Sequence, residues 1–270
     1  MGRYDGAEFY ARPSIATVFY DTLFTAPSIA GDLEFYKAFC ARNGTRFIDA
    51  ACGTGRIAKA VAAPFRRIVA FDNSPYFIGR MRQEVVSNPP PGRIQVRRSR
   101  LETFGFNGLF DGIIVSYYAF NHVLDAGDRE TCFRNLLDHL RPGGRIVIQL
   151  PRIDLLTRTV PRHEIDALCV ERRIEVPALS GDDTRPLTVR QDVEWMHFDT
   201  ASGIRSIGYR FGLVQDGKVL HEEQVTKRLA AVSPAAVDAI ARRHDARIVD
   251  RLDGFHDGVR SEAIFEIEKR

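Results

Sequence analysis

The sequence predicts an α/β fold in which a parallel sheet with helices on both faces carries an inserted antiparallel β-sheet. Three observations predict it. Between residues 46 and 150, short apolar runs bounded by turn residues alternate with amphipathic segments, as expected of repeated βα units. A glycine-rich turn, Cys52-Gly53-Thr54-Gly55, follows the first apolar run. Between residues 187 and 229, three long segments alternate apolar and polar residues with a period of two, which indicates strands.

The N-terminal 45 residues predict a helical segment. Ser14 can cap a helix, and apolar residues recur at helical spacing from Ile15 to Phe39. Asn43-Gly44 is a typical helix stop. We therefore expect helical structure over residues 14–42, and we interpret residues 1–45 as a helical lid.

The α/β region then follows strand by strand. We expect strands at Arg46–Ala50, Arg67–Phe71, Ile94–Arg97, Gly112–Ser116 and Arg145–Leu150, with helices at Gly55–Ala63, Pro75–Val86 and Asp128–Leu140. Pro142-Gly143-Gly144 stops the third of these helices. After the insertion, a helix at Pro234–His244 and strands at Ala246–Arg251 and Glu262–Glu268 complete the sheet.

The insertion is expected to be an antiparallel meander. Its strands are Leu187–Phe198, Gly203–Gln215 and Lys218–Leu229, and Asp216-Gly217 predicts a tight hairpin turn between the last two. Residues 151–182 have a mixed pattern that assigns no element. We therefore predict an inserted subdomain at 151–229 within an α/β domain made of 46–150 and 230–270.

Alternation along the first inserted strand also predicts which side chains are buried. Trp195 and His197 are expected to share one face with Val189 and Val193, in the core or at an interface.

Composition narrows the functional classes. The chain has 38 Lys and Arg against 35 Asp and Glu, and its hydrophobic fraction of 44% is that of a globular protein. The densest basic run, Arg97–Arg100, is too short for a nucleic-acid surface, so we expect no nucleic-acid partner. We find neither a signal-peptide pattern nor an apolar run of the ~18 residues that span a bilayer. Four separated cysteines without zinc spacing predict a cytoplasmic protein with no metal site.

The chemistry is concentrated at the first two strand ends. Gly53 and Gly55 allow a sharp bend and the close approach of a ligand. Asp49, just before them, would repel a pyrophosphate but suits a ligand that carries an ammonium and a sulfonium. Asp72, after the second strand, can bind both ribose hydroxyls. A nicotinamide cofactor could also use Asp72, but only a methionine-derived nucleoside also needs Asp49. The alternative is that these four residues bind no ligand and simply form a generic βαβ turn.

Three motifs in order resemble the class I (Rossmann-like) S-adenosylmethionine (SAM)-dependent methyltransferase family. They are Asp49-x-x-Cys-Gly-Thr-Gly55, Phe71–Pro75 and Leu140–Arg145. The resemblance covers roughly residues 15–150 and 233–268, and it implies a seven-stranded sheet whose last strand is antiparallel. The chain is also similar to small-molecule methyltransferases that have a Tyr-Asp pair, here Tyr20-Asp21, and an Asn-His pair, here Asn121-His122. Several of these carry an antiparallel insertion after the fifth strand.

The resemblance implies a cofactor site for SAM. Asp49 and the Ala51–Gly55 backbone would hold the methionine portion, Asp72 the ribose, and Asn73 or Phe77 would lie against the adenine. Ser116 would also touch the cofactor. After the third strand the family usually has an Asp for the adenine amino group, but this chain has Arg100, so the Leu101 backbone is the remaining candidate. The expected cofactor-binding residues are Asp49, Ala51, Gly53, Gly55, Asp72, Asn73, Phe77, Arg100, Leu101 and Ser116.

Methyl transfer requires alignment and exclusion of water more than covalent chemistry. We expect His122 to act as a base or to orient the acceptor, with Tyr20 and Tyr117 closing the site; a structural role for His122 is the alternative. The expected acceptor is an N or O nucleophile of a small molecule, in secondary metabolism. A SAM-binding protein that does not methylate is a second hypothesis, and an RNA methyltransferase is disfavoured. The inserted sheet would shape the acceptor pocket, form a homodimer contact, or do both.

Overall fold

A computed structural model describes residues 2–5, 10–23, 31–174, 187–255 and 261–270. The chain forms two compact units. The α/β unit comprises Pro27–Leu156 and Ala230–Arg270, and the β unit comprises Met1–Ala26 and Thr157–Leu229. Each unit is therefore built from two separate stretches of the chain.

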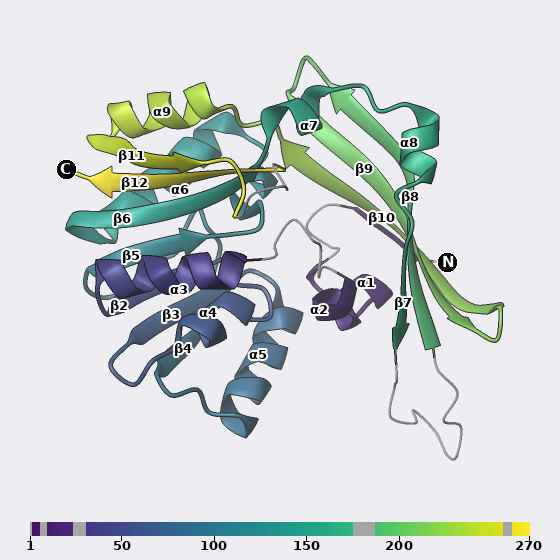
Figure 1. Cartoon of the computed structure of the whole chain (residues 1–270), viewed down its shortest axis with the longest axis horizontal. Helices are drawn as coiled ribbons and strands as arrows, with labels where there is room; N and C mark the ends of the chain where they lie inside the picture. The colour runs from purple at the N-terminus through teal and green to yellow at the C-terminus, as the bar shows by residue number, and fades with distance from the viewer. Residues whose placement is uncertain (1, 6–9, 24–30, 175–186, 256–260) are drawn as a thin grey trace. The chain divides into compact units, whose positions relative to one another are not determined.

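The α/β unit contains a seven-stranded sheet in the order β11-β12-β6-β5-β2-β3-β4 (Figure 1). Its strands are β2 (Arg46–Ala50), β3 (Arg67–Asp72), β4 (Arg93–Arg98), β5 (Phe110–Val115), β6 (Leu140–Pro151), β11 (Ala246–Leu252) and β12 (Glu262–Lys269). Strands β4, β3, β2, β5 and β6 run parallel, whereas β12 is antiparallel to both β6 and β11. The predicted seven-stranded sheet with its last strand antiparallel is confirmed.

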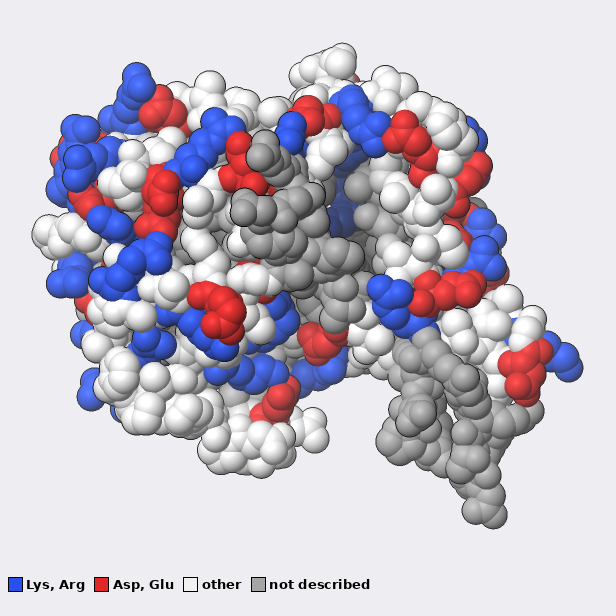
Figure 2. Space-filling model, in the orientation of Figure 1, with Lys and Arg blue, Asp and Glu red and all other residues white. Residues whose placement is uncertain are grey.

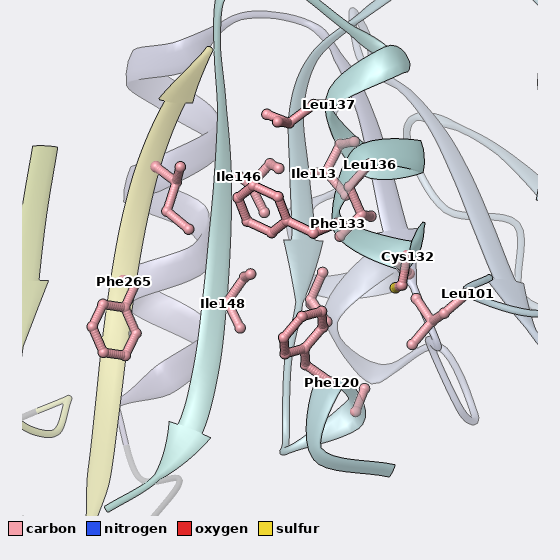
Figure 3. Packing of buried hydrophobic residues seen from close by; sticks show 14 of the residues in the cluster. Leu101, Ile113, Phe120, Cys132, Phe133, Leu136, Leu137, Ile146, Ile148 and Phe265 are labelled. Carbon is pink, nitrogen blue, oxygen red and sulfur yellow. The ribbon is translucent and has the colours of Figure 1, made fainter. Parts of the chain in front are cut away.

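Helices cover this sheet on two faces. They are α3 (Asp32–Asn43), α4 (Arg56–Val61), α5 (Pro75–Ser87), the 3-10 helix η3 (Ala119–His122), α6 (Ala126–Asp138) and α9 (Pro234–Arg243). A short helix, α7 (Ile153–Thr157), follows β6. Ser74 and Ser233 cap α5 and α9, and each is followed by a proline that suits the first helical position. Two apolar clusters fill the two faces, one under α3, α4 and α5 and the other under α6 and α9. Figure 3 shows Phe133, Leu136 and Leu137 of α6 close to strand residues of the second cluster.

Several predicted boundaries differ from the structure. The helix predicted at Asp128–Leu140 begins at Ala126 because Asp125 caps it, with Oδ1 accepting from the Asp128 N–H at 2.9 Å. It ends at Asp138, and the next strand begins at Leu140 rather than at Arg145, since Leu140 pairs with Phe110. The Pro-Gly-Gly segment therefore lies inside β6, at a shift in register, and does not precede the strand.

The β unit contains a five-stranded sheet in the order β1-β10-β9-β8-β7. Its strands are β1 (Gly2–Asp5), β7 (Val170–Ile174), β8 (Leu187–Asp199), β9 (Ile204–Gln215) and β10 (Lys218–Ala230). Asp216 and Gly217 have φ of 49° and 75°, so the predicted hairpin turn has the two positive φ angles of a type I′ turn. The inserted antiparallel sheet is confirmed. The sequence pattern did not indicate β1, which pairs in parallel with β10, or β7, which lies in the segment of mixed pattern.

The N-terminal helical segment is divided. Helices α1 (Ile15–Val18) and α2 (Tyr20–Leu23) belong to the β unit with α8 (Arg162–Asp166), whereas α3 belongs to the α/β unit. Residues 24–30 of the predicted helical stretch, and 175–182 of the segment of mixed pattern, lie outside the described residues.

A β-bulge in β8 overturns one burial prediction. Val193 pairs with Tyr209 but Trp195 pairs with Gly208, so β8 holds one extra residue at this point. After the bulge, the side chains of β8 lie on the opposite faces of the sheet from those that period-two alternation predicts. Trp195 is 42% exposed, and its ring lies so close over Gly208 that an added Cβ would be 2.2 Å from Trp195 Nε1. The prediction that Trp195 and His197 share the buried face of Val193 is therefore wrong, and Met196 packs beside Val193 in their place.

Charges of both signs are interspersed over the face seen in Figure 2. In the part of the chain that the structure describes, no helix is long and apolar enough to cross a membrane.

Candidate functional site

A left-handed turn joins β2 to α4. Ala51, Gly53 and Gly55 have φ of 55°, 55° and 78°, a region that glycine occupies without strain. Gly55 is the N-cap of α4, and a Cβ added there would lie 2.4 Å from Met81 Cε. Gly55 is therefore required both for its backbone conformation and for the close packing of Met81, so the prediction of a sharp glycine bend holds.

Asp49 lies below this turn with a buried carboxylate, 1% exposed. Its Oδ2 accepts a hydrogen bond from the Ala58 N–H at 2.9 Å, whereas Oδ1 is buried and has no hydrogen-bond partner among the described residues. Burial raises the pKa of Asp49 to about 7, against the opposing effects of the Ala58 N–H and of Arg56. The Arg56 guanidinium is itself held by Asp32, with Nη1 2.9 Å from Oδ1. Asp49 thus offers an unused acceptor in a low-dielectric site.

Asp72 is the last residue of β3 and faces the same turn. Its Oδ2 accepts from the Gly53 N–H at 2.9 Å and its Oδ1 from the Ser74 N–H at 2.8 Å. Burial raises the pKa of Asp72 although these backbone donors favour the charged form. Each carboxylate oxygen keeps a further lone pair. Asp72 therefore fixes the glycine turn and can still accept hydrogen bonds from the hydroxyls of a ligand.

A strained turn follows β5. Tyr117 and Tyr118 have φ of 47° and 64°, which is uncommon for residues other than glycine. Their rings stack with centroids 5.2 Å apart and planes 15° apart. Ser116, just before them, is 7% exposed, and its carbonyl accepts from the Ala119 N–H at 3.1 Å. The expected site residues Ser116 and Tyr117 thus lie at the end of β5, which adjoins β2 in the sheet.

A buried polar network holds this turn. Gln149 Oε1 accepts from the Tyr117 N–H at 2.8 Å and from the Tyr36 hydroxyl at 3.1 Å. Gln149 Nε2 donates to Glu262 Oε2 at 3.2 Å, and the Tyr118 hydroxyl donates to Glu262 Oε1 at 2.5 Å. Burial raises the pKa of Glu262 although its hydrogen-bond donors oppose the shift. Two fully buried strand residues, Gln149 and Glu262, therefore constrain both tyrosines.

The remaining predicted cofactor residues lie along the ends of β3 and β4. Phe77 is buried in α5, and its N–H donates to Ser74 Oγ at 3.1 Å. The Asn73 carbonyl accepts from Arg98 Nε at 3.3 Å. The exposed Arg100 side chain pairs with Glu102 at 2.9 Å. The Leu101 side chain is buried in the apolar cluster that lies under α6 and α9.

Comparison with known proteins agrees with this geometry. Residues 47–144 match a methyltransferase domain family. The fold is similar to that of a SAM-dependent methyltransferase from Clostridium acetobutylicum, with a TM-score of 0.69 at 15% identity over 94% of this chain and 97% of that chain. The chain therefore has the class I methyltransferase fold, and its residues 47–144 are similar to a methyltransferase domain.

Other proteins are similar to parts of this chain or to its fold. It is 30% identical over 157 residues to an O-methyltransferase of Aspergillus nomiae, a match that covers 57% of this chain and 66% of that protein. The chain spans only 52% of a Bacillus subtilis relative to which it is 26% identical. The SAM-bound structure of CalS10, an amino pentose methyltransferase from Micromonospora echinaspora, has a TM-score of 0.65 at 14% identity, over 96% of this chain and 98% of that chain. At such identities the likeness to solved structures is one of fold.

The two residues of the Asn-His pair have different environments in the α/β unit. Asn121 is fully buried, and its Nδ2 donates to the Ala230 carbonyl at 2.9 Å. His122 ends η3 and is exposed. Tyr20 belongs to the β unit, where its ring meets that of Tyr10 edge-on at 6.4 Å. The roles proposed for His122, Tyr20 and Tyr117 stay predictions.

Sequence reasoning missed Gln149 and Glu262. Gln149 interrupts the apolar residues of β6, and Glu262 directly precedes the apolar residues of β12; both side chains are fully buried. A polar residue at such a position needs a buried partner, and this was the available signal. The partner itself could not be identified, because the two residues are 113 positions apart.

Proposed function

We propose that this protein is a SAM-dependent methyltransferase that transfers a methyl group to an N or O nucleophile of a small molecule. One observation carries the proposal: a buried Asp49 oxygen has no hydrogen-bond partner among the described residues, beside a glycine turn that the Asp72 carboxylate binds. An unsatisfied buried acceptor costs free energy, and an ammonium group would satisfy it. A dinucleotide pyrophosphate would instead be repelled.

The residues present fit the cofactor. Asp49 would bind its ammonium group, the backbone of Ala51, Gly53 and Gly55 would lie against its methionine portion, and Asp72 would accept from its ribose hydroxyls. Asn73, Phe77, Arg100, Leu101 and Ser116 complete the proposed set. When bound, the cofactor supplies an electrophilic methyl group on a sulfonium.

The chain's own residues would align the acceptor and remove its proton. We assign His122 to accept or relay that proton, because imidazole titrates near neutral pH and its exposure allows exchange with solvent. Tyr117, constrained by the Gln149 carbonyl oxygen, would hold the acceptor in one orientation. Tyr20 would close the site and exclude water.

The acceptor class is supported by the relatives. The matched proteins include an O-methyltransferase and an amino pentose methyltransferase of calicheamicin biosynthesis. We propose a small hydroxyl- or amine-bearing acceptor in secondary metabolism, methylated in the cytoplasm by a homodimer that associates through the β unit.

Calorimetry with S-adenosylhomocysteine tests the proposal. Asp49→Asn should weaken binding at least tenfold, because an uncharged amide cannot pair with the ligand's ammonium. The matched control Asp138→Asn, at an exposed position of α6, should bind like the wild type. If the wild type bound a nicotinamide dinucleotide but neither SAM nor its demethylated product, the proposal would be rejected. Release of S-adenosylhomocysteine during turnover separates a methyltransferase from a SAM-binding protein that does not methylate.

A further inference from the structure

A pocket in the α/β unit lies along β3 and β4 and reaches the first residues of β2, β3 and β4, whereas Asp49 and Asp72 lie toward the ends of their strands. Its volume is about 370 Å³, within the range of small-molecule sites. Among the described residues, four arginines and the amides of Gln95 and Asn107 line it, and no acidic residue does; the arginines are Arg46, Arg67, Arg93 and Arg97.

The strand register places these arginines on one face. Arg46 pairs with Arg67, and Arg67 pairs with Arg93, so the three stand in a row across neighbouring parallel strands. Arg97 lies four residues after Arg93 on β4 and therefore points to the same side. The Arg46 guanidinium lies over the Phe110 ring at 5.4 Å, which identifies the side as the one that carries the α6 cluster.

A row of like charges on adjacent strands is unfavourable unless a counter-charge is present. Among the described residues, no carboxylate forms an ion pair with any of the four arginines. Asp111 contacts the backbone beside the row: its Oδ2 accepts from the N–H groups of Thr45 and Arg46, and its Oδ1 pairs with Arg141 Nε at 2.7 Å. No carboxylate in the part of the chain that the structure describes therefore compensates the four positive charges.

We propose that this arginine pocket binds a small polyphosphate-bearing ligand. Guanidinium groups bind phosphate oxygens in bidentate geometry, and a ligand with two or three linked phosphates matches the row of Arg46, Arg67 and Arg93 in charge. A single phosphate would leave about half of the positive charge uncompensated. Gln95 and Asn107 supply neutral donors and acceptors at the wall of the pocket.

The test is calorimetric titration with inorganic tripolyphosphate at fixed ionic strength, without any methyl donor. The double variant Arg67→Gln/Arg93→Gln should raise Kd at least tenfold. The control double variant Arg134→Gln/Arg242→Gln removes the same net charge from exposed positions of α6 and α9, and it should bind like the wild type. Because the readout does not involve SAM, its result is independent of the proposed methyl transfer.

The proposal is overturned if both double variants lose affinity equally, since net charge alone would then explain binding. It is also overturned if sulfate at the same ionic strength competes as well as tripolyphosphate, or if a short single-stranded RNA binds more tightly through the same arginines. Loss of fold in the Arg67→Gln/Arg93→Gln variant is checked by its melting temperature. We expect that temperature to be unchanged or raised without ligand, because the substitutions relieve repulsion between neighbouring arginines.

Discussion

At the scale of single residues, burial of the Asp49 carboxylate lowers the stability of the ligand-free protein but favours binding of a cationic ligand. Its pKa is raised from the ordinary value of 3.8 to about 7, so the folded protein binds more protons than the unfolded chain between these values. Stability therefore falls as pH rises through this window. We expect Asp49→Asn to stabilise the ligand-free protein at pH 8 by up to about 4 kcal/mol, although it abolishes tight cofactor binding.

Chemical denaturation at pH 8 and at pH 5 measures this effect. The difference between wild type and Asp49→Asn should shrink at pH 5, where the wild-type carboxyl is protonated in the folded state. Asp138→Asn serves as the control at both pH values. A variant less stable than the wild type at pH 8 would contradict the assigned cost of burying the charge.

The same carboxyl predicts how binding depends on pH. A cationic ligand needs the ionised form of Asp49, whose pKa in the free protein is about 7. The affinity for S-adenosylhomocysteine should therefore be constant above pH 8 and fall by up to about tenfold per pH unit below 7. Titrations at pH 8.5, 7.5, 6.5 and 5.5 measure it, and a constant Kd across this range would exclude Asp49 as the partner of the ammonium group.

At the scale of elements, the glycine turn is held by steric contact as well as by conformation. Gly55→Ala should destabilise the protein by roughly 1–3 kcal/mol, since it combines a positive φ with the contact to Met81 Cε. Adding Met81→Ala should recover the steric part but not the conformational part. Thermal melts of the two single variants and the double variant measure the coupling; strictly additive effects would show that the contact with Met81 carries no cost.

The turn after β5 depends on the hydroxyl that Tyr118 donates to Glu262. Tyr118→Phe should cost about 1–3 kcal/mol, because a buried carboxyl loses a donor. It should also lower kcat more than KM for the acceptor, because the turn positions Tyr117. Tyr209→Phe is a suitable control, as it removes a hydroxyl without a hydrogen-bond partner among the described residues. If both variants behaved alike, the Tyr118–Glu262 bond would have no positioning role.

The elements that depend on residues close together in the sequence were predictable. Glycines, capping serines and apolar strands placed β2, β3, α5 and the Asp216-Gly217 turn, because each depends on residues that are close in sequence. The bulge at Glu194 was not predictable, since period-two alternation continues through it and only pairing with β9 reveals the extra residue. The network around Gln149 and Glu262 was missed for the same reason, as its partners come from distant segments.

At the scale of the whole molecule, the β unit is assembled from both the N-terminal segment and the insertion. Strand β1 pairs with β10, and the Ile15 N–H donates to the buried Glu223 Oε2 at 2.8 Å. Glu223→Ala should therefore cost about 1–3 kcal/mol and speed hydrogen exchange in α1. The neighbouring Glu222→Ala is the control. Equal exchange rates in the two variants would show that this bond does not fasten α1 to the sheet.

The α/β unit is likewise discontinuous, and this has a consequence for its biosynthesis. Strand β12 pairs with β6, yet Glu262 lies 113 residues after its partner Gln149. At translation rates of about 5–20 residues per second, that edge of β6 waits roughly 6–20 s for its neighbour on the ribosome. The nascent sheet can be completed only after the inserted segment has emerged, when the strand that closes it also delivers the acceptor for the Tyr118 hydroxyl.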